Sequence, residues 1–474
     1  MSFVEESGNL RLRRAKSVTL GNLVEGESRK ENRLRTVQPD KPCHKHRDSL
    51  LSSSSGYTNY RGVLNLCIVL LVLSNARVAL ENIIKYGILI DPVQWFKVFL
   101  SRPTHSPSTL ILFGLGIFPL LSLGIEKLLA KGHLSENISR FLIVCLLTAE
   151  VLIPPVVVYV TDCHAVAASF VLGFVAIVFF KLISYHMVNF WCRESSSPTH
   201  KVRRRSVSSD RGRRKDVRNG GSSSNLVSYP NNLNLKDVYY FLLAPTLCYE
   251  LNFPRSTRIR KRFLVKRLLE MLFLLQLILC LFQQWMVPTI NNSLKPLQDM
   301  DYSRMLERLL KLAVPNHFIW LIFFYWYFHS CLNAVAEILK FGDRNFYNDW
   351  WNSESIQYFW QNWNIPVHKW CVRHLYIPLL QSGVTKSQAS IAVFFVSAFF
   401  HEYLVSVPLK MFRVWAFLGM LSQIPFSSFV EKYLHNQYGN MAVWISLIIG
   451  QPLCILMYYH DYYVIHFKSV EAAQ

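Results

Sequence analysis

Long apolar runs dominate the pattern of hydrophobic and polar positions along this chain. Nine runs approach the roughly 20 residues that a helix needs to cross a bilayer. Lipid offers no partner for backbone groups left unpaired outside helices or closed barrels. The sequence therefore predicts an all-α, polytopic membrane protein with about nine transmembrane helices. The expected spans are residues 63–80, 109–129, 141–160, 168–188, 268–288, 313–335, 388–409, 412–430 and 441–459.

The overall composition supports a membrane protein. Of the 474 residues, 51% are hydrophobic and 17% are charged, whereas about a quarter of the residues are charged in soluble domains. A soluble protein of this length would fold as about two or three domains built from amphipathic elements. The apolar residues instead form unbroken runs, which favours spans over soluble cores.

Basic residues are clustered between the expected spans, and they give the chain a net charge of +21. Twelve of them precede the first span, a second group (KVRRRSVSSDRGRRK) follows the fourth, and RSTRIRKR leads into the fifth. The positive-inside bias places such clusters in the cytosol, where they also attract anionic headgroups. We therefore expect membrane lipid as a partner, no nucleic acid, a cytosolic N-terminus and, after nine crossings, a luminal C-terminus.

Polar segments divide the chain. Residues 1–60 are expected to be a disordered basic cytosolic tail without a signal peptide, so that the first span directs insertion. A membrane domain then covers 61–467, with a flexible cytosolic insert at about 194–235 and an interfacial aromatic segment at 346–380. Residues 468–474 would form a short luminal tail.

The ten cysteines show no pairing pattern and no CxxC spacing. Cys67, Cys145, Cys280 and Cys454 fall in the middle of expected spans, where a thiol is a small apolar core residue. The sequence therefore predicts no metal site.

A histidine and a glutamate interrupt the apolar run IAVFFVSAFFHEYLVSV at 391–407. A charge at the centre of a membrane helix costs about 2.5–3.5 kcal/mol, so ionisable residues there usually face a cavity and serve a function. A neutral imidazole costs less and is the form that a general base needs. His401 is therefore the candidate base, although a histidine satisfied by a helix carbonyl would look the same in sequence.

Spacing tests the other chemistries that a His-Glu pair suggests. Val405 occupies the fifth position where a HExxH zinc site needs histidine, and Ser406 stands where a His-x4-Asp acyltransferase motif needs aspartate. No GxSxG element precedes a histidine in lipase order. Ser397 lies on the same helix face as His401, whereas Glu402 points about 100° away, which favours an orienting or cross-helix role for this glutamate.

The segment 346–376 is too polar to span a membrane and too aromatic for an ordinary soluble loop. Ten of its 31 residues are aromatic, and it holds five of the twelve tryptophans. An interfacial or re-entrant helix with its rings at headgroup depth fits this composition, and Ser353 could cap it. A purely anchoring belt would not explain the hydrogen-bonding residues Gln361, Asn362, Asn364 and His368.

Longer motifs connect these two regions to a known family. FYNDWWN at 346–352, QNWNIPVHKW at 361–370 and SAFFHEYLVSVPL at 397–409 resemble the membrane-bound O-acyltransferases, and the likeness extends over about 46–467. FYxDWWN is shared with the sterol branch of that family, whereas the other two motifs are similar to the diacylglycerol branch.

The resemblance implies an endoplasmic-reticulum enzyme that transfers a fatty acyl group from acyl-CoA to diacylglycerol inside an intramembrane reaction chamber. Acyl-CoA would be a co-substrate, so that no cofactor is needed, and relatives suggest a homo-oligomer, either a dimer or a tetramer. His401 would be catalytic, supported by Asn364, Glu402, Ser397 and Gln451.

The resemblance also implies an acyl-CoA path along the second motif. Its residues are Trp360, Gln361, Asn362, Trp363, Asn364, Ile365, Pro366, Val367, His368, Tyr376 and Ser390. The first motif consists of Phe346, Tyr347, Asn348, Asp349, Trp350, Trp351 and Asn352. Relatives often carry basic residues after the second motif, where this chain has Ile377, Gln381, Ser382 and Ser390 but retains Lys386.

Chemistry and likeness together suggest a direct transfer without an acyl-enzyme. His401 would remove the acceptor's hydroxyl proton while Asn364 or Gln451 donates a hydrogen bond to the developing oxyanion. Two alternatives stay open. A sterol or long-chain alcohol acyltransferase would share this base, and a transporter would use polar residues such as Gln423, Gln451 and Asn333 as a pathway.

Overall fold

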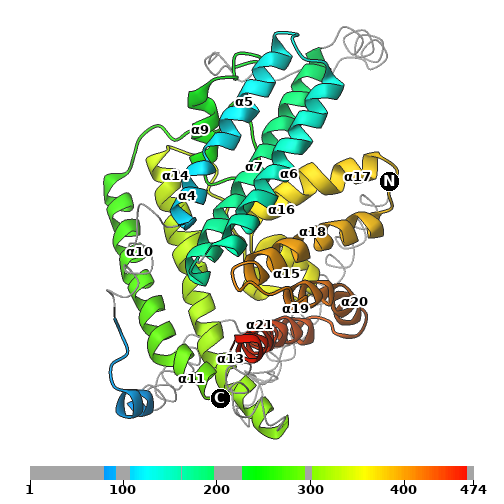
Figure 1. The fold of residues 1–474 in the computed structure, drawn as a ribbon. Helices are drawn as coiled ribbons and strands as arrows, with labels where there is room; N and C mark the ends of the chain where they lie inside the picture. The colour runs from blue at the N-terminus through cyan, green and yellow to red at the C-terminus, as the bar shows by residue number, and fades with distance from the viewer. Residues whose placement is uncertain (1–79, 92–106, 162, 197–226, 294–301, 467–474) are drawn as a thin grey trace, which may run out of the picture. The chain divides into compact units, whose positions relative to one another are not determined.

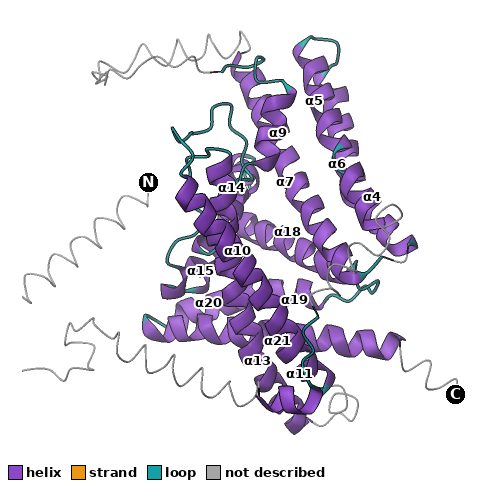
Figure 2. Ribbon diagram, turned by 90° about the vertical axis from the view of Figure 1, so that its left-hand side faces the viewer, coloured by secondary structure: helices purple, strands orange, loops and turns teal. Residues whose placement is uncertain are grey.

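The computed structural model describes residues 80–91, 107–161, 163–196, 227–293 and 302–466. Four predicted segments lie wholly or mostly outside these ranges: the tail 1–60, the span 63–80, the insert 194–235 and the tail 468–474. The described residues are helical or loop, and their only β-type pairing is an isolated bridge between Arg255 and Phe341 (Figure 2). The all-α prediction is therefore confirmed.

The described helices fall into three groups along the chain (Figure 1). The first group is α4 (Pro107–Gly114), α5 (Ile117–Ala130), α6 (Glu136–Val160), α7 (Ala165–Ser196) and α9 (Leu235–Leu243). The middle group is α10 (Lys261–Leu281), η1 (Phe282–Met286), α11 (Val287–Asn291), α13 (Tyr302–Phe324), η2 (Tyr325–Cys331) and α14 (Leu332–Ile338). The last group is η3 (Trp350–Asn352), α15 (Ile356–Asn362), α16 (Ile365–Cys371), η4 (Val372–Tyr376), α17 (Ile377–Gln381), α18 (Lys386–Ser406), α19 (Trp415–Leu421), α20 (Gln423–Tyr433) and α21 (Gln437–His466).

Six helical stretches in the described part of the chain are long and apolar enough to cross a membrane, which confirms a polytopic protein. They coincide with six of the nine expected spans. Their bounds are Pro107–Ala130, Glu136–Val160, Ala165–Ser195, Ser303–Ile338, Lys386–Ser406 and Gln437–Tyr462.

Two expected spans differ from these six. The span predicted at 412–430 is wrong as a single helix, because the chain forms the short helices α19 and α20 there. Pro425 explains the break, since it has no N–H for the carbonyl of Leu421 and its ring clashes with that carbonyl. Residues 268–288 are helical throughout as α10, η1 and α11, but they are not among the six stretches.

Helices α5, α6 and α7 lie side by side, and α18 packs across α7 (Figure 1). The α7–α18 contact is an apolar cluster that includes Val171, Val175, Phe400 and Tyr403. Phe400 lies 4.7 Å from the ring of Phe180 and 5.6 Å from the ring of Phe179. Burying aromatic rings of this kind fixes one side of α18 on α7.

The end of α9 is tied to α7 by a buried lysine. Lys181 Nζ donates to the carbonyls of Phe241, Leu242 and Ala244 at 2.9, 2.8 and 2.7 Å. Three ammonium protons thus meet three carbonyls at the end of a helix, where carbonyls lack partners within the helix. Among the described residues, these backbone carbonyls and not a carboxylate satisfy the lysine inside its apolar span.

The helices α16 and η4 also pack on α7. Trp370 Nε1 donates to the carbonyl of Phe180 at 2.8 Å. Ser184 Oγ accepts from the Tyr249 amide at 2.7 Å and shares a hydrogen bond with His374 Nε2, 2.8 Å away. Burial, reinforced by the nearby Arg373 charge, lowers the pKa of His374 to about 4. The His374 ring is therefore neutral at physiological pH.

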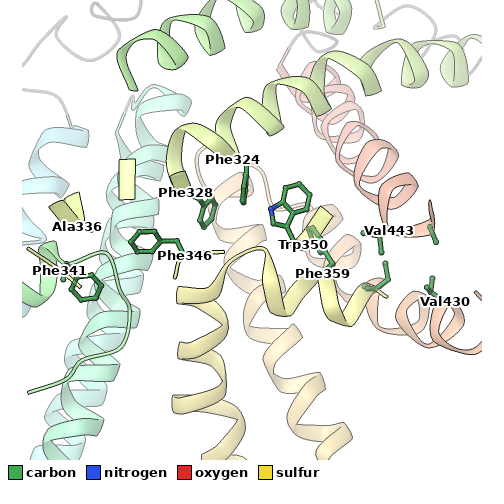
Figure 3. Packing of buried hydrophobic residues seen from close by; sticks show 12 residues of the cluster. Phe324, Phe328, Ala336, Phe341, Phe346, Trp350, Phe359, Val430 and Val443 are labelled. Carbon is green, nitrogen blue, oxygen red and sulfur yellow. The ribbon is translucent and has the colours of Figure 1, made fainter. Parts of the chain in front are cut away.

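Aromatic residues form a second core between α13, the 346–376 segment, α20 and α21. Phe324 lies 5.0 Å from Phe328 and 4.9 Å from Trp350, and Trp350 lies 5.8 Å from Phe359 (ring centroids; Figure 3). Phe346, Trp350 and Phe359 are almost fully buried here. Core packing, and not only anchoring in lipid headgroups, thus accounts for the unusual aromatic content of this segment.

Short polar caps define where several helices begin. Thr385 and Gln388 form a capping box at the start of α18, and Ser355 Oγ accepts from the Tyr358 amide at 3.1 Å at the start of α15. The cap predicted at Ser353 is therefore wrong. Ser353 is buried and donates its hydroxyl to the carbonyl of Trp350, so it is not available for the helix.

Candidate active site

The histidine of α18 has one nitrogen engaged and one available. His401 Nδ1 lies 2.8 Å from the backbone carbonyl of Ser397. A carbonyl oxygen can only accept, so Nδ1 carries the proton of the neutral ring and Nε2 keeps its lone pair. The side chain is exposed. His401 is thus held in the tautomer that a general base requires, by the carbonyl and not the hydroxyl of Ser397.

One face of α18 carries the polar positions. Ser390, Phe394, Ser397 and His401 are spaced four, three and four residues apart, which aligns them on one side of the helix. The ring of Phe394 lies 6.2 Å from the ring of Trp360 in α15. The structure therefore brings the aromatic segment to the same face of α18 as His401.

The first motif folds back on α15. Asn348 donates from its backbone to the carbonyl of Asn362 at 2.9 Å and from its side chain to Asn362 Oδ1 at 2.8 Å. Asp349 accepts from the Tyr358 hydroxyl at 2.8 Å, and Tyr347 bonds His329 Nδ1 at 2.7 Å. The polar residues of the motif thus connect it by hydrogen bonds to α15 and to η2.

The remaining motif residues divide between the core and the surface. Phe346 and Trp350 are buried, whereas Trp351 is exposed. Asn352 Nδ2 lies 3.5 Å from Asp349 Oδ2, at the limit of a hydrogen bond. Within the described part of the chain, none of these residues hydrogen-bonds His401. Their visible contribution is to shape the wall that α15 presents to α18.

Asn364 caps a helix. Its Oδ1 accepts from the Val367 amide at 3.2 Å, and Pro366 follows in the first turn of α16, a position that tolerates the missing N–H. This cap explains why the sequence has an asparagine between two short helices. The amide Nδ2 takes no part in the cap.

Glu402 bonds away from His401, across to two other helices. Its carboxylate accepts from the Tyr458 hydroxyl of α21 at 2.7 and 2.8 Å and from the Phe417 amide of α19 at 3.0 Å. Ser406, one turn further along α18, donates to the same carboxylate. These contacts agree with the 100° separation of Glu402 from the polar face.

Gln451 is oriented by a neighbour that the sequence did not reveal. Its Oε1 accepts from Asn316 Nδ2 of α13 at 3.2 Å, which leaves the Gln451 amide hydrogens as donors. Gln451 precedes Tyr458 by two turns, about 10 Å along the same face of α21. Asn316 and Tyr458 are polar residues within predicted spans, which is the sequence signal that could have identified them. Their hydrogen-bond partners, however, follow only from the fold.

A cavity of about 300 Å³ adjoins α16, lined by Cys248, Glu250, His368, Lys369, Val372 and Arg373. Lys369 forms a 2.7 Å ion pair with Asp343, and Arg373 donates to the Tyr249 carbonyl at 3.0 Å. Burial lowers the pKa of His368 below its usual range, so it adds no charge at neutral pH. The cavity combines two basic side chains, the acidic side chain of Glu250 and a neutral imidazole.

The other expected acyl-CoA residues are more scattered. Ile365 is buried, Gln361 and Val367 are exposed, and Pro366, Trp363, Asn362 and Tyr376 are half-buried. The exposed Ser390 donates to the carbonyl of Lys386 at 3.0 Å, four residues earlier on α18. Among these residues, only His368 lines the cavity beside α16.

Comparison with known proteins places this geometry in a family. The profile of the membrane-bound O-acyltransferase family matches residues 156–460. The chain is 57% identical to diacylglycerol O-acyltransferase 1 of Bos taurus, with 91% of this chain and 87% of the relative aligned.

The same protein of Homo sapiens is 56% identical (91% and 86% covered), and that of Arabidopsis thaliana is 38% identical (90% and 78% covered). The residues matched by the family profile include α18 and the aromatic segment. The chain therefore belongs to the membrane-bound O-acyltransferase family.

Proposed function

We propose that this chain is an acyl-CoA:diacylglycerol O-acyltransferase, which makes triacylglycerol and free CoA. One observation carries the proposal: relatives that bear this name are up to 57% identical over about nine tenths of the chain. The free Nε2 of His401, inside a membrane-length helix, supplies a base for the chemistry that this name implies.

The reaction needs one proton to move twice. His401 Nε2 takes the proton of the free diacylglycerol hydroxyl as that oxygen attacks the thioester carbonyl, and a new C–O bond forms. The tetrahedral intermediate then expels CoA as a thiolate when the C–S bond breaks. The His401 imidazolium returns the proton to this sulfur. General-base assistance of this kind contributes about 10²–10⁴-fold to the rate.

The developing oxyanion needs a donor that is already in place. Asn364 Nδ2 lies outside the helix cap, and the Gln451 amide hydrogens are left over by its bond to Asn316. In each side chain the amide oxygen already accepts a hydrogen bond, and this bond orients the amide nitrogen. The reorganisation required during the reaction is therefore smaller. Both belong to the supporting set of this proposal.

The acyl-CoA enters along α16. The cavity beside this helix offers Lys369 and Arg373 to anionic phosphates, and His368 lies in the same lining. The acyl chain would continue past the aromatic segment toward Trp360, which adjoins the His401 face of α18. Diacylglycerol reaches the base through the lipid phase.

The protein acts in the endoplasmic-reticulum membrane as a homo-oligomer, with its N-terminus and the 346–380 segment in the cytosol and its C-terminus in the lumen. The basic insert supports this orientation by the positive-inside bias. Tags at the two termini should show opposite protease protection in sealed microsomes. Equal protection of both tags would contradict an odd number of crossings.

The acceptor is tested by supplying one alcohol at a time. Microsomes that contain the chain receive labelled acyl-CoA with diacylglycerol, a sterol or a long-chain alcohol. Triacylglycerol with stoichiometric CoA release is expected, and preferential esterification of the sterol or long-chain alcohol would move the chain to another branch of the family. Transport of a solute without any CoA release would contradict an acyltransferase altogether.

A further inference from the structure

Glu402 is a carboxylate in an apolar span that is satisfied by neutral donors alone. The Tyr458 hydroxyl, the Ser406 hydroxyl and the Phe417 amide donate to it. Within the described residues no basic side chain forms an ion pair with it, and the nearby Arg413 instead pairs with Asp461 at 3.2 Å. A half-buried carboxylate without a cation depends on each of these hydrogen bonds.

The Tyr458 hydroxyl connects three helices. Its proton goes to Glu402 of α18, while its oxygen accepts from the Ala416 amide of α19 at 3.1 Å. Tyr458 itself belongs to α21, where its side chain is 5% exposed. The Phe417 amide of α19 donates to Glu402, so α19 is bonded to Glu402 as well as to Tyr458. The position of α18 relative to α19 and α21 is thus fixed at the residue next to His401.

We propose that Tyr458 and Glu402 are positioning residues, which fix the rotation of α18 and so place His401 Nε2 against the substrates. The inference rests on the proposed acyl transfer. A ring nitrogen about 6 Å from a helix axis moves about 1 Å when the helix rotates by about 10°. A displacement of about 1 Å between reacting groups can cost about 100-fold in rate.

The geometry separates this role from catalysis. Glu402 and His401 are adjacent, so their side chains leave the helix about 100° apart, and they bond to different partners. The His401 ring is oriented by the Ser397 carbonyl on α18 itself. The pair Glu402–Tyr458 therefore acts on the helix that carries the base, and not on the imidazole.

The test compares three variants in purified, detergent-solubilised protein. Tyr458→Phe removes one hydroxyl, Glu402→Gln replaces the acceptor, and the double variant removes both. We expect each single variant to lower kcat about 10-fold, with KM for acyl-CoA within about two-fold of wild type. The double variant should lose little more than the more severe single variant, because both changes weaken the same contact between Glu402 and Tyr458.

Tyr459→Phe is the matched control, since Tyr459 is the next residue of α21 and its hydroxyl bonds Asn291 Oδ1 at 2.6 Å, away from α18. It should keep wild-type kcat. Wild-type kcat in Tyr458→Phe, or losses that multiply in the double variant, would overturn the positioning role. A wild-type preparation that makes no triacylglycerol would instead count against the proposed function, so the two failures are distinct.

Discussion

Phe400 and His401 are neighbours in sequence, yet they belong to two different regions of the molecule. Phe400 is 8% exposed and lies against Phe179 and Phe180 of α7. His401 is exposed and shares its face with Ser397, Ser390 and Phe394, where Trp360 approaches. One helix therefore serves as a packing surface on one side and as the support of a reactive group on the other.

This difference shows how a membrane enzyme can keep a polar group in an apolar helix. The face of α18 that packs on α7 supplies the contacts that hold the helix in place. The face that carries His401 therefore does not need to contribute to packing. The polar positions on it need only local satisfaction, as the Ser397 carbonyl provides for His401. Substitutions on the two faces should consequently affect different quantities.

The largest expected effect on activity is at the reactive face. His401→Ala should lower acyl transfer at least about 100-fold, because general-base assistance contributes about 10²–10⁴-fold to a reaction of this kind. Expression and acyl-CoA binding should stay normal, since the ring makes only a bond within its own helix. The check is turnover with labelled acyl-CoA beside a binding measurement. A folded, binding-competent variant with near wild-type turnover would remove His401 as the base.

Substitution of the adjacent residue, Phe400, should lower stability and leave turnover nearly unchanged. Phe400→Ala removes a ring from the α7 contact and should destabilise the protein by about 3–5 kcal/mol, the usual cost of such a cavity. Unfolding in detergent measures the loss. Turnover per folded molecule should stay within about three-fold of wild type. A stable variant with strongly reduced turnover would mean that both faces of α18 serve the reaction.

The packed side also predicts a pH dependence of stability. His374, beside α7, has a pKa of about 4, below the ordinary 6.5, because burial disfavours its charged form. The unfolded chain binds the proton first, so stability is complete above about pH 6.5 and falls by about 3 kcal/mol as pH drops towards 4. The depressed pKa of His368 acts in the same direction.

His374→Gln should flatten this dependence, since glutamine cannot take up the proton but offers an oxygen to Ser184. Unfolding at several pH values from 7 to about 4 compares the variant with wild type. An equal loss of stability in both proteins would assign the effect to other groups.

The smallest effect concerns the segment that faces the reactive side. Asn364→Ala and Ser355→Ala each remove one helix cap, at a cost of about 1 kcal/mol in stability. If Asn364 Nδ2 also assists the reaction, turnover should fall about 10-fold in Asn364→Ala and remain nearly normal in Ser355→Ala. Acyl-CoA binding should change less than turnover. Matching turnover in the two variants would leave Asn364 as a cap only.

Much of the fold could be predicted from local patterns. Six of the nine expected spans coincide with membrane-length helices, because an apolar run must close its own backbone hydrogen bonds. The failure at 412–430 had a local cause in Pro425, and the misplaced cap at Ser353 arose because two serines stood within one turn of the start of α15. Local signals thus predict that a helix is present better than they predict where it begins and ends.

The sequence by itself determined that the chain is a helical membrane protein, that His401 is the polar group most in need of an explanation, and that its motifs belong to a known family. Only the tertiary structure decided that Glu402 is held by Tyr458 and Phe417, and that Trp360 lies against the His401 face of α18. The physical reason is that hydropathy and helical spacing act over a few residues along the chain. Hydrogen-bond partners such as Asn316 for Gln451, 135 residues apart, are chosen only when the helices pack.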